Sequence, residues 1–206
     1  MGKFSFEEVN ELYVDVLREI GNIGSGNATT AIASMLNLRL NMNVPKVELL
    51  SFQEFGSAIS AEDETIVGIY LGLEQDIEGS MMFLMKLDSA HYLVNRLMGR
   101  DPDYKEDFTE MDLSAIKEIG NIIAGSYLSA LSSMTNLTIS PTIPYVAIDM
   151  AAAILSVPAC MFGQYGDNAL LIETQFGDDV AIRGYFILMP EQESYYKILS
   201  ALGIAI

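Results

Sequence analysis

Apolar residues recur at intervals of three and four positions in two long segments of the chain, from Glu7 to about Leu38 and from Met111 to about Leu137. In the first segment the recurring apolar positions are Leu12, Val16, Ile20 and Ile23. Because a helix has 3.6 residues per turn, this spacing places them on one side of a helix. The pattern therefore predicts two long amphipathic helices, each with one buried face.

Shorter apolar runs bounded by turn residues predict strands. One such run follows a proline after each long helix, and a hairpin-like pair of runs and a short helix come next. The predicted strands span residues 46–52, 65–73, 79–85, 145–150, 169–176 and 180–189. The predicted short helices span residues 89–98 and 194–202. The acidic segment 100–107, which contains Pro102, is the predicted joint between the two sets of elements.

The two sets of elements form an internal repeat. The run Glu-Ile-Gly-Asn-Ile begins at Glu19 and again at Glu118, 99 positions later, and the 34 columns from Val14 to Val47 contain 13 identities at this offset. Chance would give about two. We therefore expect one domain, residues 1–206, made of two repeats of about 1–100 and 101–206. The expected fold class is α/β of the α+β type, with two pseudo-two-fold-related halves and helices packed on a largely antiparallel sheet.

A narrow polar stripe runs along each long helix, beside its apolar face. At 100° per residue, four positions of each helix fall within about 60° of one another. They are Asp15, Glu19, Asn22 and Gly26 in the first helix, and Ser114, Glu118, Asn121 and Gly125 in the second. Asn and Gly are poor helix formers, and a helix selected only for stability would avoid them. The stripes are therefore the candidate sites, each with a carboxylate and an amide three residues apart.

The glycines around the stripes have a second interpretation. The run from Gly21 to Gly26 lacks the spacing of a nucleotide-binding loop, and no strand pattern precedes it. Gly21 and its counterpart Gly120 fit close packing against a neighbouring element as well as they fit a role in function.

Composition narrows the choice of partners. Half of the 206 residues are hydrophobic, and 28 acidic residues against 11 basic ones give a net charge of −17. Such a chain can form a core, and it lacks the clustered cations that bind nucleic acid or anionic membranes. With no signal-peptide pattern and no apolar stretch near the about 20 residues that span a bilayer, we expect a cytoplasmic protein. Cys160, the sole cysteine, is expected to be buried, and His91 to be structural.

The fixed spacing of both stripes resembles a known family. Two segments match the pattern [DS]-x3-E-x2-N-x22-P, which is the signature of the CheC/CheX/FliY phosphatases of bacterial chemotaxis. The matching residues are Asp15, Glu19, Asn22 and Pro45, and then Ser114, Glu118, Asn121 and Pro144. Two intact motifs in a chain that the repeats almost fill favour the two-motif, CheC-like branch over single-motif CheX and over switch members with extra terminal domains.

The resemblance implies a reaction, the hydrolysis of the aspartyl phosphate of the response regulator CheY. It implies that Asn22 and Asn121 position water, while Glu19 and Glu118 dock the partner by pairing with a cation beside the phosphorylated residue. The Mg²⁺ ion would belong to CheY, so the chain is expected to have no cofactor and no metal site of its own. Supporting roles fall to Asp15 and Ser114 near the active edge and to Pro45 and Pro144 as turns into the next strand.

The resemblance also implies a second partner, the deamidase CheD. The segment from Ala147 to Leu155 is small and apolar with one acid, Asp149, and the first repeat has no counterpart of its alanine run. This departure fits a one-sided binding surface for CheD, and it fits equally well a buried helix with Asp149 at its N-cap.

Two other functions stay open besides the phosphatase. The first is a module of the flagellar switch type that binds phosphorylated CheY without turning it over. The second is an acidic adaptor whose main task is the regulation of CheD.

Overall fold

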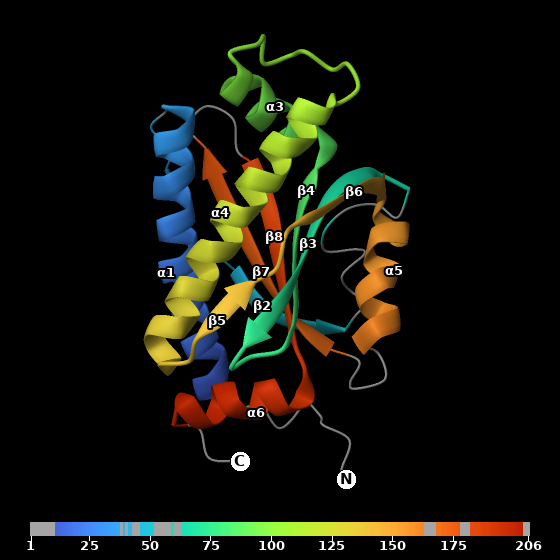
Figure 1. Cartoon of the computed structure of the whole chain (residues 1–206). Coiled ribbons are helices and arrows are strands. Elements are labelled where there is room, and N and C mark those ends of the chain that lie inside the picture. The colour runs from blue at the N-terminus through green and yellow to red at the C-terminus, as the bar shows by residue number, and fades with distance from the viewer. Residues whose placement is uncertain are drawn as a thin grey trace.

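The computed structural model describes residues 11–37, 39, 41–42, 46–51, 59, 63–162, 168–177 and 182–203. They form one antiparallel sheet of eight strands between two layers of helix (Figure 1). The long helices α1 (Glu11–Leu36) and α4 (Glu110–Thr135) lie side by side over one face, and α5 (Ala151–Phe162) covers part of the other. The mixed architecture of helices on an antiparallel sheet is the one predicted from the sequence.

The strands of the sheet agree closely with the apolar runs. Their order is β1-β7-β8-β4-β3-β5, with β2 also paired to β7 and β6 also paired to β3. Their bounds are β1 Asn41–Met42, β2 Lys46–Ser51, β3 Thr65–Gln75, β4 Gly79–Lys86, β5 Ile139–Pro141, β6 Tyr145–Met150, β7 Asn168–Gly177 and β8 Ile182–Pro190. The short strands β1 and β5 were not predicted.

The hairpin of each half, β3–β4 in the first and β7–β8 in the second, pairs with a strand from the other half. The first-half strand β2 pairs with β7, and the second-half strand β6 pairs with β3. At the centre of the sheet β4 pairs with β8, and Met82 stands opposite Ile187. Helices α1 and α4 both have 26 residues, and their first residues are 99 positions apart. The division into two repeats nevertheless stays a prediction from the sequence.

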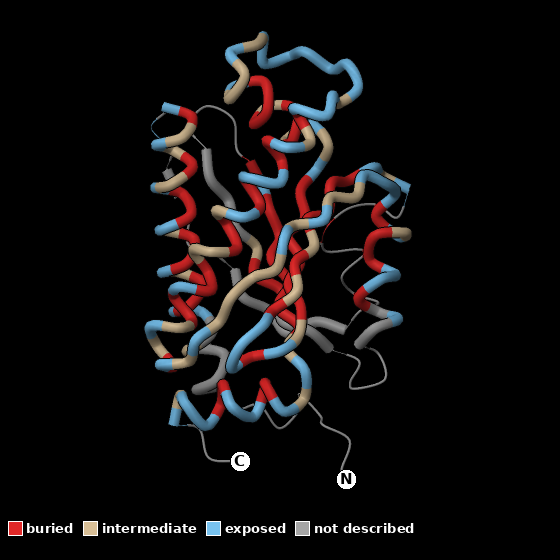
Figure 2. Tube along the Cα trace, viewed as in Figure 1, coloured by how far each residue is buried: buried red, intermediate tan, exposed pale blue. Residues whose placement is uncertain are grey.

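The sheet separates two clusters of buried side chains because successive residues of a strand point to opposite faces. Under α1 and α4 the strands contribute residues such as Ile69 and Phe83, both at most 2% exposed. On the other face Leu84 and Ile187 pack against Ile154 of α5. The buried positions follow the inner side of each helix and most of the central strands (Figure 2).

Two predictions about burial were wrong. Ile23 was assigned to the buried face of the first helix, but it is 38% exposed, because it lies nearer to the polar stripe than Ile20 does. Cys160 was expected to be buried, but it is exposed on α5. Only one side of α5 rests on the sheet, so an apolar residue of that helix can face solvent.

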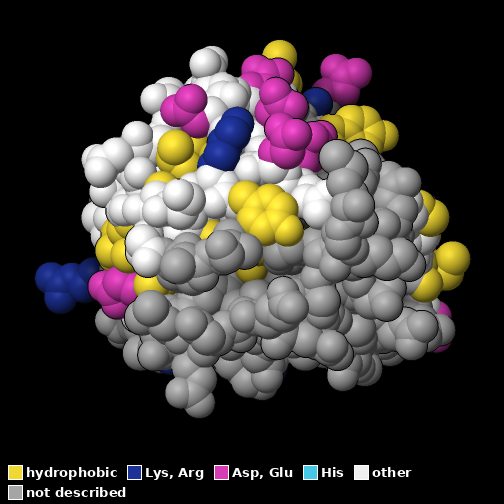
Figure 3. Space-filling view, turned by 90° about the horizontal axis from the view of Figure 1, so that it is seen from below, with side chains coloured by type: hydrophobic (Ala, Val, Ile, Leu, Met, Phe, Trp, Pro, Cys, Tyr) yellow, Lys and Arg dark blue, Asp and Glu magenta, His cyan; other side chains and the backbone are white. Residues whose placement is uncertain are grey.

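Short helices close the two ends of the sheet, α3 (Leu87–Met98) at one end and α6 (Gln192–Ala201) at the other (Figure 1). Seen from the α6 end, the described surface carries acidic side chains next to hydrophobic ones (Figure 3). Among the described residues, no helix combines the length and the apolar character that a membrane span requires.

Candidate functional site

Both predicted Glu/Asn pairs lie on the outer side of the long helices. Glu19 and Asn22 belong to α1, where Glu19 is exposed and Asn22 is half-buried. Glu118 and Asn121 belong to α4, and both are exposed. Residues three apart on a helix are neighbours, with about 5–6 Å between their Cβ atoms. Each pair therefore presents a carboxylate and an amide to solvent as one unit.

The two pairs occupy separate places on the surface. α1 and α4 run in opposite directions across the sheet (Figure 1). Each Asn is the twelfth of the 26 residues of its helix, so both pairs stand near the middle of a helix. Glu and Asn are therefore neighbours within each pair, and the two pairs lie on two different helices.

Glycines hold the helices close to their neighbours and leave the surface open beside each Asn. A Cβ atom on Gly120 would lie 2.6 Å from Cγ2 of Ile69, so this glycine permits contact between α4 and the sheet. By contrast, Cβ atoms on Gly26 and Gly125 would meet nothing within 4 Å. The close-packing role is confirmed for Gly120, and the two stripe glycines leave room for a partner next to Asn22 and Asn121.

The supporting motif residues have different surroundings. Ser114 is exposed, and its Oγ donates a hydrogen bond to the backbone oxygen of Glu110 at 3.0 Å. Asp15 lies in α1, and Pro144 is half-buried directly before β6. Pro45 is outside the residues that the structure describes.

Two groups with lowered pKa values, Asp112 and His91, lie near the start of α4. Asp112 is 1% exposed and forms an ion pair with Arg100 at 2.9 Å and a capping box with Thr109. Burial raises the pKa of Asp112, but hydrogen bonds from Arg100 and Thr109 lower it by more, so the pKa lies below its usual value. The ring of His91 stacks on Phe108 at 4.2 Å, and burial lowers its pKa. Asp112 stabilises the start of α4, and the buried, stacked ring of His91 agrees with the structural role predicted for it.

In the part of the chain that the structure describes, no three His, Cys, Asp or Glu residues gather closely enough to hold a metal ion. Each stripe has an amide that can orient water by hydrogen bonding and a carboxylate that can bind a cation.

Asp149 lies at the edge of the sheet rather than at the cap of a helix. It is exposed near the end of β6, its Oδ1 accepts a hydrogen bond from the backbone N–H of Met150 at 2.8 Å, and α5 begins only at Ala151. Asp149 therefore does not occupy the N-cap position, whereas the helix of that interpretation is present as α5, buried at Ala151, Ile154 and Leu155 and exposed at Val157 (45%).

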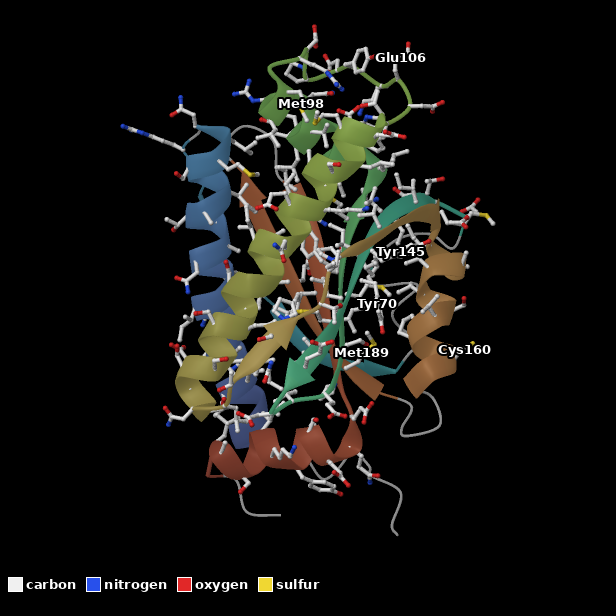
Figure 4. All side chains as sticks on the ribbon, viewed as in Figure 1. Tyr70, Met98, Glu106, Tyr145, Cys160 and Met189 are labelled. Atoms are coloured by element: carbon white, nitrogen blue, oxygen red, sulfur yellow. The ribbon has the colours of Figure 1, made fainter. Side chains whose placement is uncertain are left out.

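Exposed apolar side chains lie along the same sheet edge as Asp149, and the sequence pattern did not reveal their exposure. Tyr145 stands opposite Tyr70 of β3, and Figure 4 shows both, with Cys160 on the nearby α5. The exposed fractions along this edge are 89% for Ile143, 68% for Tyr145, 38% for Ile148 and 50% for Met150. An apolar strand at a sheet edge has the same sequence pattern as a central strand, so only the pairing reveals the exposure.

Comparison with known proteins identifies the family. The model of the CheC-like family matches residues 14–49 and 111–148. The CheY-P phosphatase CheC of Bacillus subtilis (strain 168) is 36% identical over 207 residues, which cover 98% of this chain and 99% of that relative. The chain belongs to the CheC-like family. The two matched segments contain both Glu/Asn pairs, so the family model and the internal repeat select the same residues.

Solved structures with the fold of the CheC-like chain include FliY and a chain of a CheX–CheY complex. Thermotoga maritima FliY matches with a TM-score of 0.76 and 20% identity, covering 95% of this chain and 98% of that one. A chain of the CheX–CheY–BeF3–Mg complex of Borrelia burgdorferi matches with a TM-score of 0.50 and 19% identity, covering 81% and 95%. At these identities the likeness shows the shared fold.

Proposed function

We propose that this chain is a chemotaxis phosphatase that hydrolyses the aspartyl phosphate of CheY in the cytoplasm. The observation that carries the proposal is the Glu/Asn pair on each of two long helices, in which both glutamates and Asn121 are exposed and Asn22 is half-buried. Membership of the CheC-like family supports it, as does the similarity over nearly the full length to a relative named as a CheY-P phosphatase.

The reaction requires little covalent chemistry from the protein. The oxygen of a water molecule bonds to phosphorus, the bond from phosphorus to the aspartyl oxygen breaks, and its electron pair stays on the carboxylate. Inorganic phosphate keeps the water oxygen and one of its protons, and the other proton passes to solvent. Positioning of the water is then the main contribution that a protein can make.

Asn22 and Asn121 supply this positioning in our proposal. A side-chain amide both donates and accepts hydrogen bonds, so it can orient a water molecule without acting as a strong base. The open space at Gly26 and Gly125 lets the partner approach the amides closely.

Glu19 and Glu118 bind and orient the partner. A carboxylate repels the phosphoryl group, so its favourable contact is a cation beside the phosphorylated residue. Asp15 and Ser114 assist from one turn away, although Ser114 already donates its hydroxyl hydrogen to Glu110. The Mg²⁺ ion is bound by CheY in this proposal, and the chain contributes no cofactor.

The decay of phosphorylated CheY, with and without the chain, tests the function. We expect a faster decay with the chain, and we expect Glu19→Gln with Glu118→Gln to raise KM more than it lowers kcat. Binding of phosphorylated CheY without any acceleration would instead indicate a module of the flagellar switch type.

CheD is the second partner in this proposal, and it binds at the edge formed by β6 and α5. The support is the exposed carboxylate of Asp149 and the exposed ring of Tyr145, which share the α5 face of the edge strand β6, with the exposed side chains of Ile148 and Met150 on its other face. Such a surface buries apolar area and adds one charged contact, as protein interfaces do.

Asp149→Lys tests the CheD surface against Glu193→Lys, which reverses an exposed carboxylate on α6. We expect the first variant to weaken CheD binding at least tenfold in a titration and the second to leave it unchanged. Unchanged binding with Asp149→Lys would contradict this surface. CheD binding by a chain that never accelerates CheY dephosphorylation would favour the adaptor.

A further inference from the structure

A basic residue precedes each motif glutamate. Among the 34 aligned columns of the repeat, the column of Arg18 and Lys117 is the one in which both halves carry a positive charge. The cations are four residues before Asn22 and Asn121, which places each cation about 40° around the helix from its Asn. Around each helix the order is therefore glutamate, asparagine, cation.

Both cations of the stripes lie on the surface of a very acidic chain. Arg18 and Lys117 are both exposed. Lys86 and Lys105 form ion pairs with carboxylates of the chain, namely Glu64 and Asp88. Within the described part of the chain, no hydrogen bond or ion pair engages Lys117. The cation beside the second Asn is therefore available to a partner.

The geometry points to a third component of each site, which rests on the proposed function. We propose that Lys117 and Arg18 bind phosphoryl oxygens of the phosphoaspartate, one cation at each site. The transferred phosphoryl group spreads negative charge over three oxygens, and a cation next to the water-positioning amide stabilises that charge. No proton or electron pair moves to or from these side chains.

Electrostatics explains why the chain needs a local cation here. The net charge of −17 repels a phosphorylated partner. Each Glu takes up a cation of the partner but adds to the repulsion of phosphate. A Lys or Arg on the opposite flank of the Asn offsets that repulsion at short range, where salt screens least.

The test uses binding, so that it does not depend on turnover. The affinity of the double variant Arg18→Gln, Lys117→Gln is measured for CheY loaded with Mg²⁺ and beryllofluoride, which mimics the phosphoryl group, and for unloaded CheY. Because a hydrogen bond to a charged group is lost, we expect affinity for loaded CheY to fall roughly tenfold at each site, with little change for unloaded CheY. An equal loss for both forms would mean that the cations contact acidic residues of CheY, and it would overturn the inference.

A matched control tests whether binding depends on cations at the stripes or only on the net charge of the chain. Arg39→Gln with Arg96→Gln removes two exposed positive charges outside the stripes. We expect the control to bind loaded CheY within twofold of wild type, and a tenfold loss there would overturn the inference. The variant Lys117→Arg should restore binding, and its melting temperature should match that of wild type.

Hydrolysis gives an independent readout. In an Asn22→Ala background, which leaves the second site, we expect Lys117→Gln to lower kcat/KM roughly tenfold. If the wild-type chain binds loaded CheY with the predicted dependence on the cations but never hydrolyses phosphorylated CheY, the proposed function fails and this inference stands. If the chain hydrolyses normally and the Gln variants behave as wild type, only this inference fails.

Discussion

Helices α1 and α4 carry the same functional stripe but pack in different ways. Both present Glu, Asn and Gly at matching positions, with a basic residue before the Glu. Their buried sides differ, because Gly24 of α1 accommodates Tyr127 of α4, whereas the counterparts of these two residues are Ile123 and Ala28. Gly24 is small where its counterpart Ile123 is large, and Tyr127 is large where its counterpart Ala28 is small. The comparison shows that the solvent-facing pattern has stayed the same where the packing has diverged.

The sequences at the starts of the two helices differ as well. Asp112 holds the first turn of α4 through Arg100 and Thr109. The positions 99 residues earlier contain Met1 and Tyr13, which can form no such ion pair. The ion pair that anchors α4 is therefore not repeated at the equivalent positions of the first repeat.

Removal of the anchor should give the largest change in stability. Arg100→Gln leaves the buried carboxylate of Asp112 without its cation, so we expect the free energy of unfolding at pH 7 to fall by about 3 kcal/mol. Urea denaturation measures this loss. As a control, Arg96→Gln replaces an exposed arginine on α3 and should lower the free energy of unfolding by less than about 0.5 kcal/mol. Equal losses in the two variants would contradict the anchor.

The ion pair of Arg100 and Asp112 predicts that the free energy of unfolding depends on pH. The pKa of Asp112 in the folded chain lies below its unfolded value, so its stabilising contribution is complete above about pH 4 and is lost as the pH falls through the folded value. The difference between wild type and Arg100→Gln should therefore narrow below about pH 4, because a protonated Asp112 needs no cation. A difference that stays constant down to pH 2 would mean that the ion pair contributes little.

The packing asymmetry predicts a smaller effect. A Cβ atom on Gly24 would lie 2.7 Å from Cδ1 and 3.0 Å from Cα of Tyr127, so Gly24→Ala forces the two helices apart. We expect a loss of about 2 kcal/mol in the free energy of unfolding, measured by urea denaturation. A neutral or stabilising result would show that α1 and α4 are not in close contact at this point.

The stripe glycines should show the smallest effect and the opposite sign. Cβ atoms on Gly26 and Gly125 would meet no neighbour, so Gly26→Ala and Gly125→Ala should each stabilise the fold by about 0.5–1 kcal/mol. Thermal denaturation of the two variants checks this expectation. Destabilisation by either variant would mean that its stripe is not open.

Local sequence patterns were sufficient to predict most of the helices and strands. The predicted strand at residues 145–150 is β6 without change, and Thr109 with Asp112 forms the capping box that a Ser/Thr-x-x-acid sequence indicates. The Glu/Asn pairs were found because helix geometry depends only on sequence spacing. Their exposure followed from the same geometry.

Pairing across the repeats could not be predicted. β2 completes the sheet beside β7, more than 100 positions away, and no local signal specifies such a contact. For the same reason the exposed apolar edge at Tyr145 was missed, and Cys160 was expected to be buried. Burial depends on which elements end up adjacent, whereas helix faces depend on periodicity.

One measurement tests the shared stripe most directly, namely the decay of phosphorylated CheY with wild type, Asn22→Ala, Asn121→Ala and the double variant. Each single variant should retain one working site, and the double variant should lose acceleration by about a hundredfold. Its melting temperature and its binding of beryllofluoride-loaded CheY should stay close to wild type. A double variant that dephosphorylates CheY as fast as wild type would contradict the account.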